Sequence, residues 1–175
     1  MSDEPKKKSK DTTKKIKASP KKSTFLGKVA PEFVLPTATG ELVSLKELRG
    51  KRVVLYFYPK DDTPGCAAQA QSFRDSRLSF SRKTTVIIGI SKDSIGRHSK
   101  FKKKYKLNFT LASDAESNVC ETYGVWKEKN MYGHSYMGIE RSTFLIDEKG
   151  IVRTEWRKVR VPGHIDEVIQ VLKSL

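Results

Sequence analysis

The sequence has few of the residues that build disulfide frameworks or metal sites. It contains only two cysteines, Cys66 and Cys120, and three histidines that are scattered along the chain. Two cysteines cannot form a disulfide framework, and they are too far apart in sequence for a C-x-x-C motif. No Cys/His group has the spacing of a metal site, so we expect no bound metal. Low cysteine content also favours a reducing intracellular compartment.

Long apolar runs and acidic residues are also scarce. No stretch approaches the length needed to span a membrane, and we recognise no signal peptide, so we expect no membrane partner. Asp and Glu number 20 against 35 Lys and Arg, which gives a net charge of +15. Residues 1–23 hold nine lysines against three acidic residues, which leaves about +9 for the remainder. The body of the chain is therefore basic in its own right.

Residues 1–23 also lack almost all large apolar side chains. Such a segment cannot bury enough surface to offset the entropy of ordering, so we predict a disordered basic tail over 1–23 and one folded domain over 24–175. Clustered lysines suit nuclear import or contact with nucleic-acid phosphates. These are Lys6, Lys7, Lys8, Lys14, Lys15 and Lys17. We predict a nuclear protein, with a cytoplasmic location and a purely solubilising tail as the alternatives.

The folded part alternates strand and helix signals. We predict, in chain order, a β-hairpin over 33–45, a strand over 53–58, a helix over 67–80, a strand over 85–91, a helix over 95–105, a strand over 109–111, a helix over 116–123, an antiparallel hairpin over 141–156 and a helix over 165–172. The early β-α-β unit implies parallel strands with a right-handed crossover. This order predicts an α/β, thioredoxin-like sandwich: a central mixed β-sheet flanked by helices, with an N-terminal β-hairpin.

One cysteine lies in a setting that favours reactivity. The loop PKDDTPGC (59–66) follows the predicted strand over 53–58 and ends at Cys66. Thr63 is a good N-cap and Pro64 suits the first helical position, so Cys66 falls in the first turn of a helix. The unpaired N–H groups and the helix dipole favour an anion there. We therefore expect a partly ionised thiol, and the thiolate is the nucleophilic form.

The spacing P-x3-T-x2-C in this loop resembles the active-site loop of peroxiredoxins, the thiol enzymes that reduce hydroperoxides. The flanking YFYPK (56–60) and TPGC (63–66) are most similar to the Q-type branch, also called bacterioferritin comigratory proteins. The resemblance covers roughly residues 25–174. It implies the same thioredoxin-like fold, reduction of hydrogen peroxide and small organic hydroperoxides without a cofactor, and thioredoxin or another thiol as reductant. Q-type relatives are often monomers, so we expect a monomer.

The resemblance also implies roles for individual residues. Cys66 attacks the peroxide and passes to sulfenic acid. Thr63 hydrogen-bonds the sulfur or a peroxide oxygen, in addition to or instead of capping the helix. Pro59 fixes the turn and covers the thiolate without a competing N–H group, or it simply ends the strand. Arg141, which opens the segment RSTFLID (141–147), meets the cysteine across the sheet.

Two points stay open at this level. Arg141 is selected by the family pattern, and a strand-edge arginine paired with Glu140 or Asp147 is the alternative. Many Q-type members carry a resolving cysteine five residues after the first, but this chain has Gln71 there. Either Cys120 attacks the sulfenic acid after local unfolding, or an external thiol does so and Cys120 is a small core residue. We favour the external thiol.

A different class of function also fits the charge. The segment RHSKFKKKYK (97–106) puts several cations on one predicted helix. With the tail, it suits a chromatin- or DNA-associated protein with a thioredoxin-like fold, in which contact with phosphates is nonspecific and catalysis is secondary. No known signature for base readout supports this alternative. A thiol–disulfide oxidoreductase is a third possibility, disfavoured because C-x-x-C is missing.

Overall fold

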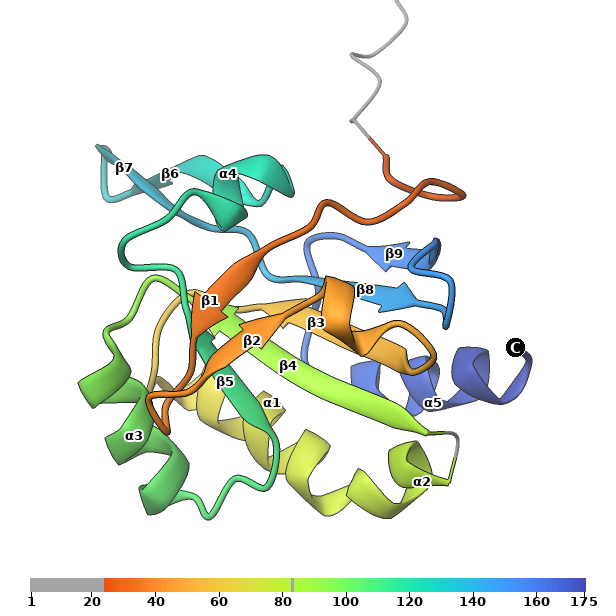
Figure 1. Ribbon diagram of the computed structural model, residues 1–175. Helices are drawn as coiled ribbons and strands as arrows, with labels where there is room; N and C mark the ends of the chain where they lie inside the picture. Colours follow the sequence, from red (N-terminus) through yellow and green to blue (C-terminus); the bar gives the residue numbers. More distant parts are fainter. Residues whose placement is uncertain (1–23, 83) are drawn as a thin grey trace, which may run out of the picture.

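The computed structural model describes residues 24–82 and 84–175, so the predicted tail over 1–23 lies outside the described residues. Its centre is a five-stranded mixed sheet with the strand order β5-β4-β3-β8-β9 (Figure 1). The central strand β3 pairs in parallel with β4 and antiparallel with β8. The strands are β3 (Arg52–Phe57), β4 (Thr85–Ser91), β5 (Thr110–Ser113), β8 (Ser142–Ile146) and β9 (Val152–Trp156). A mixed sheet flanked by helices is the predicted architecture.

Alternation along β3 divides the core into two layers, one on each face of the sheet. Every residue from Val53 to Tyr58 is at most 1% exposed, because both faces of this β-branched and aromatic run are covered. Val53, Leu55 and Phe57 belong to one cluster of buried residues, and the residues between them belong to the other. The two layers therefore touch different sets of elements.

Four helices cover one face and a hairpin covers the other (Figure 1). The first layer packs against α1 (Pro64–Asp75), α2 (Arg77–Ser81), α3 (Ile95–Lys104) and α5 (His164–Lys173). The opposite layer packs against β1 (Val34–Pro36), β2 (Leu42–Ser44) and α4 (Val119–Thr122), with the short 3-10 helix η1 (Lys46–Leu48) after β2. The β1–β2 hairpin confirms the predicted N-terminal hairpin.

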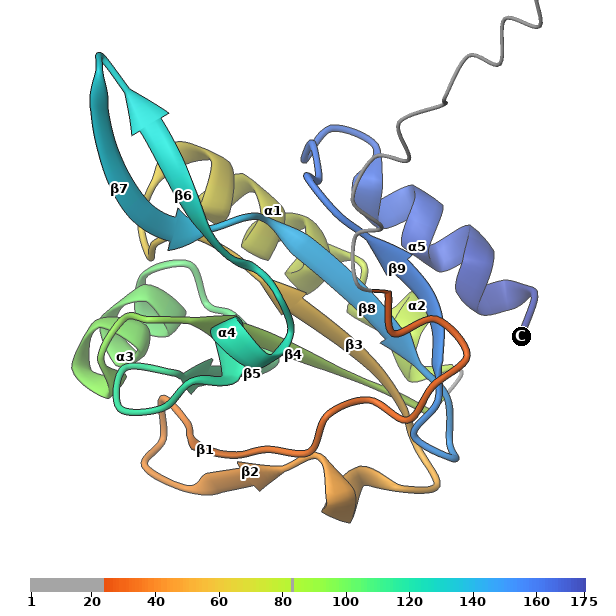
Figure 2. The ribbon, with the colours of Figure 1, turned by 90° about the horizontal axis from the view of Figure 1, so that it is seen from above.

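A second hairpin, which the sequence did not predict, projects from the body (Figure 2). Its strands are β6 (Trp126–Met131) and β7 (His134–Ile139), paired antiparallel over six residue pairs. Tyr132 and Gly133 join them with φ values of 51° and 79°, the left-handed conformation that two-residue hairpin turns require. Most of its residues are exposed, so it lacks the alternation of apolar and polar residues by which strands are recognised.

Two predicted helices differ from the structure. The helix predicted over 67–80 is interrupted at Ser76, whose φ of −93° and ψ of 6° leave the α-helical region, so α1 and α2 are separate. The helix predicted over 116–123 is the single turn α4, because the carboxylate of Asp114 binds the first N–H groups only from Val119 onward. The remaining boundaries differ from the prediction by one or two residues, a usual uncertainty at element ends. Within the described residues, no helix is long and apolar enough to cross a membrane.

Candidate active site

The loop between β3 and α1 places Cys66 at the start of a helix and under cover. The N–H group of Tyr58 donates to the carbonyl of Ile90 at 3.1 Å, which carries the β3–β4 pairing one residue past the strand. Pro59 follows and has no N–H group, so the pairing ends there. After the loop, α1 begins at Pro64 and Cys66 stands in its first turn, 2% exposed. The sulfur is therefore buried where the helix dipole favours negative charge.

Arg141 reaches this sulfur from the far side of the sequence. It directly precedes β8, the antiparallel neighbour of β3, and its Nη2 atom donates to Sγ of Cys66 at 3.2 Å. A guanidinium in contact with sulfur stabilises the ionised thiol. The strand-edge alternative is not seen: Asp147 instead lies 3.7 Å from Arg153, and no ion pair between Arg141 and Glu140 is present among the described residues. The structure thus brings Cys66 and Arg141 together.

Thr63 occupies the N-cap position without capping through its side chain. Its backbone is extended, with φ of −96° and ψ of 154°, and its carbonyl accepts from the N–H group of Ala67 at 2.8 Å. The hydroxyl donates to the carbonyl of Lys60 at 2.9 Å and accepts none of the first-turn N–H groups. The predicted cap position is therefore correct, whereas the predicted side-chain cap is wrong. Those N–H groups are not taken up by the threonine hydroxyl.

Gln69, which the sequence reasoning missed, holds the other branch of the arginine. Its side chain is buried, and Oε1 accepts a hydrogen bond from Nη1 of Arg141. Its Nε2 atom has no hydrogen-bond partner within residues 24–82 and 84–175. A residue three positions after Cys66 lies on the same side of a helix, and this spacing was the available signal. Gly65 gives the guanidinium room, because a Cβ atom there would lie 3.3 Å from Nη2.

Two further side chains, Lys129 and Tyr56, interact electrostatically with the Cys66 sulfur. Lys129 on β6 is half-buried, and the pKa of Lys129 is lowered by burial and by the Arg141 cation, with the Cys66 sulfur acting in the opposite direction. The Tyr56 hydroxyl is buried and has no hydrogen-bond partner in the described part of the chain. Burial, followed by the charge of Cys66, raises the pKa of Tyr56. The Arg141 cation therefore contacts the sulfur, and Lys129 and the Tyr56 phenol interact with it electrostatically.

Cys120 lies in a contrasting place. It is fully buried in the first turn of α4, where the carboxylate of Asp114 accepts from the N–H groups of Val119 at 3.1 Å and Cys120 at 2.8 Å. Burial and then the Asp114 carboxylate raise the pKa of the Cys120 thiol well above its ordinary value. Cys120 packs in one core layer and Cys66 in the other, so the sheet separates them. The structure does not bring the two cysteines together.

Comparison with known proteins shows the family to which the chain belongs. The model of the AhpC/TSA family matches residues 26–155. Peroxiredoxin Bcp of Bacillus subtilis is 51% identical over 150 residues, which cover 86% of this chain and 96% of that protein. Peroxiredoxin Bcp of Escherichia coli is 43% identical over 148 residues, with 85% and 95% covered.

Solved structures agree with these matches. The bacterioferritin comigratory protein of Xanthomonas campestris, described for its alkyl peroxide reduction activity, aligns with a TM-score of 0.78 and 41% identity over 81% of this chain and 90% of that one. A cysteine-to-serine variant of PrxQ from Xylella fastidiosa aligns with a TM-score of 0.81 and 35% identity, with 85% and 95% covered.

The chain therefore belongs to the AhpC/TSA family. Its curated relatives and structural neighbours place it with the Q-type, or Bcp, peroxiredoxins, so it is an enzyme, a thiol peroxidase with a thioredoxin-like fold. This confirms the predicted class of enzyme. The alternative of a chromatin-associated protein with secondary catalysis has no support in these relatives.

Proposed function

We propose that Cys66 is the residue that attacks the peroxide. Its thiolate sulfur attacks one peroxide oxygen, an S–O bond forms as the O–O bond breaks, and the departing oxygen takes up a proton and leaves as water or an alcohol. The sulfur is oxidised by two electrons to sulfenic acid. The observation that carries this proposal is the contact of 3.2 Å between Arg141 Nη2 and Cys66 Sγ in the first turn of α1.

The neighbours of the sulfur are suited to the charge that moves during this step. The Arg141 guanidinium stabilises the thiolate and, with its remaining N–H groups, the negative charge on the leaving oxygen. The Thr63 hydroxyl donates its hydrogen to the carbonyl of Lys60, so its oxygen keeps lone pairs that can accept the peroxide proton. Pro59, half-buried beside the loop, contributes cover without an N–H group that competes for the sulfur.

We assign hydrogen peroxide and small organic hydroperoxides as substrates. The alkyl peroxide reduction described for the Xanthomonas campestris relative supports the organic hydroperoxides. The burial of Cys66 supports small molecules, because only a small oxidant reaches a sulfur that is 2% exposed without movement of the loop.

We assign resolution of the sulfenic acid to an external thiol, from thioredoxin or another thiol reductant. Cys66 and Cys120 belong to different core layers, so Cys120 attacks Cys66 only after local unfolding brings α1 and α4 together. A disulfide also requires Cα atoms within about 7 Å. The first external thiol forms a mixed disulfide and releases water, and a second thiol reduces that disulfide. We propose that the enzyme works as a monomer, as the resemblance to Q-type peroxiredoxins implies.

A peroxide titration read by mass spectrometry tests these assignments. We expect one equivalent of hydrogen peroxide to add one oxygen to Cys66 in the wild type and in Cys120→Ser. We expect no such product, and no thiol-dependent peroxidase activity, in Cys66→Ser. Full activity of Cys66→Ser would contradict the nucleophile. An intramolecular Cys66–Cys120 disulfide as the main wild-type product would contradict external resolution.

The nuclear location and nonspecific contact of the basic tail with DNA stay predictions. The lysines that carry them lie outside the described residues. The relatives named above come from bacteria, which have no nucleus, and this fits the cytoplasmic alternative. Salt-sensitive retention of the full chain on DNA, lost when residues 1–23 are deleted, is the outcome that the tail prediction requires.

A further inference from the structure

A buried histidine lies directly behind the loop that carries Cys66. His98, on α3, is fully buried, and its Nδ1 atom lies 2.6 Å from Oδ2 of Asp61, which belongs to the loop and is 3% exposed. Its Nε2 atom lies 3.0 Å from the carbonyl oxygen of Ala112 on β5. The reaction described above uses neither His98 nor Asp61.

The partners of the ring determine its protons. A backbone carbonyl only accepts, so Nε2 carries a hydrogen. Oδ1 of Asp61 accepts from the Tyr58 hydroxyl at 2.6 Å, and the same hydroxyl lies 3.3 Å from Nδ1 of His98. One proton lies between Nδ1 and Oδ2 of Asp61, so a short hydrogen bond joins the ring to the carboxyl group. Breaking a buried pair of this kind by removing one partner is costly, because the other partner is left buried without a hydrogen bond.

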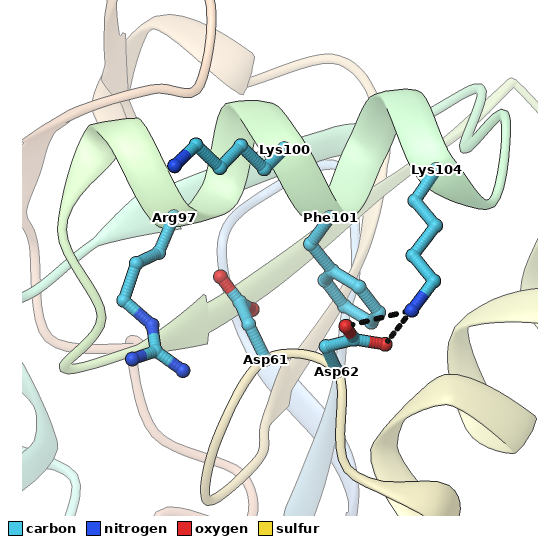
Figure 3. A pocket seen from close by; sticks show the side chains of 6 residues that line it. All are labelled: Asp61, Asp62, Arg97, Lys100, Phe101 and Lys104. Atoms are coloured by element: carbon cyan, nitrogen blue, oxygen red, sulfur yellow. Dashed lines mark hydrogen bonds and ion pairs between the residues drawn. The ribbon is translucent and has the colours of Figure 1, made fainter.

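The loop is also held by its backbone and by its next residue. The Asp61 N–H group donates to Oδ2 of Asp93 at 2.9 Å, and the Ser91 hydroxyl donates to the same oxygen at 2.6 Å. Asp62 accepts from Lys104 at 2.9 Å in an exposed pair (Figure 3). Asp61, Asp93 and His98 are close enough to hold a metal ion, but these hydrogen bonds already occupy the atoms that would bind one.

We propose that the buried Asp61–His98 pair is a latch that positions the Cys66 loop for attack on peroxide, and that release of this latch exposes the sulfur to the reducing thiol. The proposal rests on the proposed role of Cys66. A sulfur that is 2% exposed admits a small peroxide but not a protein thiol, so the loop moves between the two half-reactions. Asp61 lies in this loop, five residues before Cys66, and its buried carboxyl group binds the loop to α3 through His98. His98 and Asp61 are thus positioning residues that act through the loop.

The latch predicts opposite effects on the two half-reactions. In His98→Gln, the loop spends less time in the attack geometry, so we expect the rate of sulfenic acid formation to fall by about 10- to 100-fold, as small misplacements of a reacting group do. We expect the preformed sulfenic acid to react faster with reduced thioredoxin, since the sulfur is exposed more often. A merely structural role would lower both rates together, in proportion to the folded fraction.

The experiment measures both rates by rapid quench and mass spectrometry in the full chain. The variants are His98→Gln, Asp61→Asn and the double variant, in which two neutral amides replace the pair. We expect the double variant to lose less than the product of the single losses, because two residues in contact are coupled and neither original partner is left buried alone. If His98→Gln does not fold, Asp61→Asn alone carries the test.

Two controls isolate the latch. Lys104→Ala removes the exposed ion pair between the same helix and the same loop, and Leu172→Ala weakens the core layer at α5. We expect neither to separate the two rates. Hydrogen exchange of residues 59–66 measures how often the loop opens and does not depend on enzyme activity. It therefore tests the latch even if the Cys66→Ser variant shows that the nucleophile is another residue. Parallel changes of both rates, or unchanged exchange in His98→Gln and Asp61→Asn, would overturn the proposal.

Discussion

The first turns of α1 and α4 place the same residue type in opposite electrostatic surroundings. Each helix carries a buried cysteine in its first turn. At α1, the sulfur of Cys66 faces the Arg141 guanidinium at 3.2 Å. At α4, the Asp114 carboxylate takes the N–H groups of Val119 and Cys120 and stands beside the thiol. The positive end of α1 therefore faces a sulfur, whereas the N–H groups at the start of α4 are already bound by the Asp114 carboxylate.

This comparison shows that burial and helix position alone do not make a cysteine reactive. Both thiols are buried in the first turn of a helix, but a cation, Arg141, contacts Cys66 and a carboxylate, Asp114, stands beside Cys120. Cys120 has a nearby cation as well, but Lys92 is shared between Asp114 at 3.1 Å and Glu121 at 3.0 Å. Burial and Asp114 dominate, so the pKa of Cys120 is raised. The cation that is aimed at sulfur separates the candidate nucleophile from the core residue.

The largest effect is expected when the cation at α1 is removed. Arg141→Met leaves the Cys66 sulfur without its donor, and we expect the rate constant for reaction with hydrogen peroxide to fall by about 10²–10³, as when one oxyanion donor is lost. Arg141→Lys keeps the charge but not the fork that holds both Cys66 and Gln69, so an intermediate rate is expected. Stopped-flow measurement gives these constants. A wild-type rate constant in Arg141→Met would contradict the claim that the cation beside Cys66 makes this cysteine reactive.

A smaller effect is expected when the anion at α4 is removed. Asp114→Asn loses one of the two acceptors for helix N–H groups, and we expect the free energy of unfolding to fall by about 1–2 kcal/mol, the usual cost of a lost cap. The pKa of Cys120 should fall toward its ordinary value but stay above it, because burial, the larger cause, remains. Urea unfolding and iodoacetamide labelling measure the two quantities.

Glu121→Gln is the matched control for Asp114→Asn. Glu121 also pairs with Lys92, but its side chain is 41% exposed and accepts no helix N–H group. We expect a change within about 0.5 kcal/mol, typical of a surface substitution. Equal losses in the two variants would show that Asp114 acts by charge alone and not as a cap.

The smallest effect is a pH dependence of stability that belongs to Cys120. The folded state keeps this thiol neutral, whereas the unfolded thiol ionises above about pH 8.5. The stabilisation is therefore complete below that pH and is lost as the pH rises, by up to about 1.4 kcal/mol per pH unit. We expect this slope between about pH 8.5 and 9.5 in Cys66→Ser and its absence in Cys66→Ser/Cys120→Ser. Identical slopes in urea unfolding of the two variants would contradict the assignment.

The sequence predicted the fold and the position of Cys66 at a helix start well because their signals are local. The apolar run over 53–58 and the PKDDTPGC loop determine the strand, the turn and the helix start in consecutive residues. Arg141 was selected only by its resemblance to a family motif, since its contact with Cys66 joins residues 75 positions apart.

The missed features depend on pairings that one segment does not encode. Lys129 lies on β6, part of a hairpin with little apolar alternation, so its electrostatic interaction with Arg141 and Cys66 has no local signal. The Asp61–His98 pair joins a loop to a helix 37 residues later, and a lone histidine in a basic segment gives no sign of burial. The side-chain cap expected at Thr63 is absent, and its hydroxyl donates to the carbonyl of Lys60, a contact that the N-cap pattern does not encode.

Gly65 gives an experimenter a way to change the geometry of the site without changing its charges. A methyl group there would come within 3.3 Å of Nη2 of Arg141, which is closer than an ordinary van der Waals contact. Gly65→Ala therefore displaces the guanidinium by a few tenths of an ångström while the sulfur, the arginine and the helix dipole are all retained. The missing side chain of Gly65 therefore sets how closely the Arg141 guanidinium approaches the start of α1.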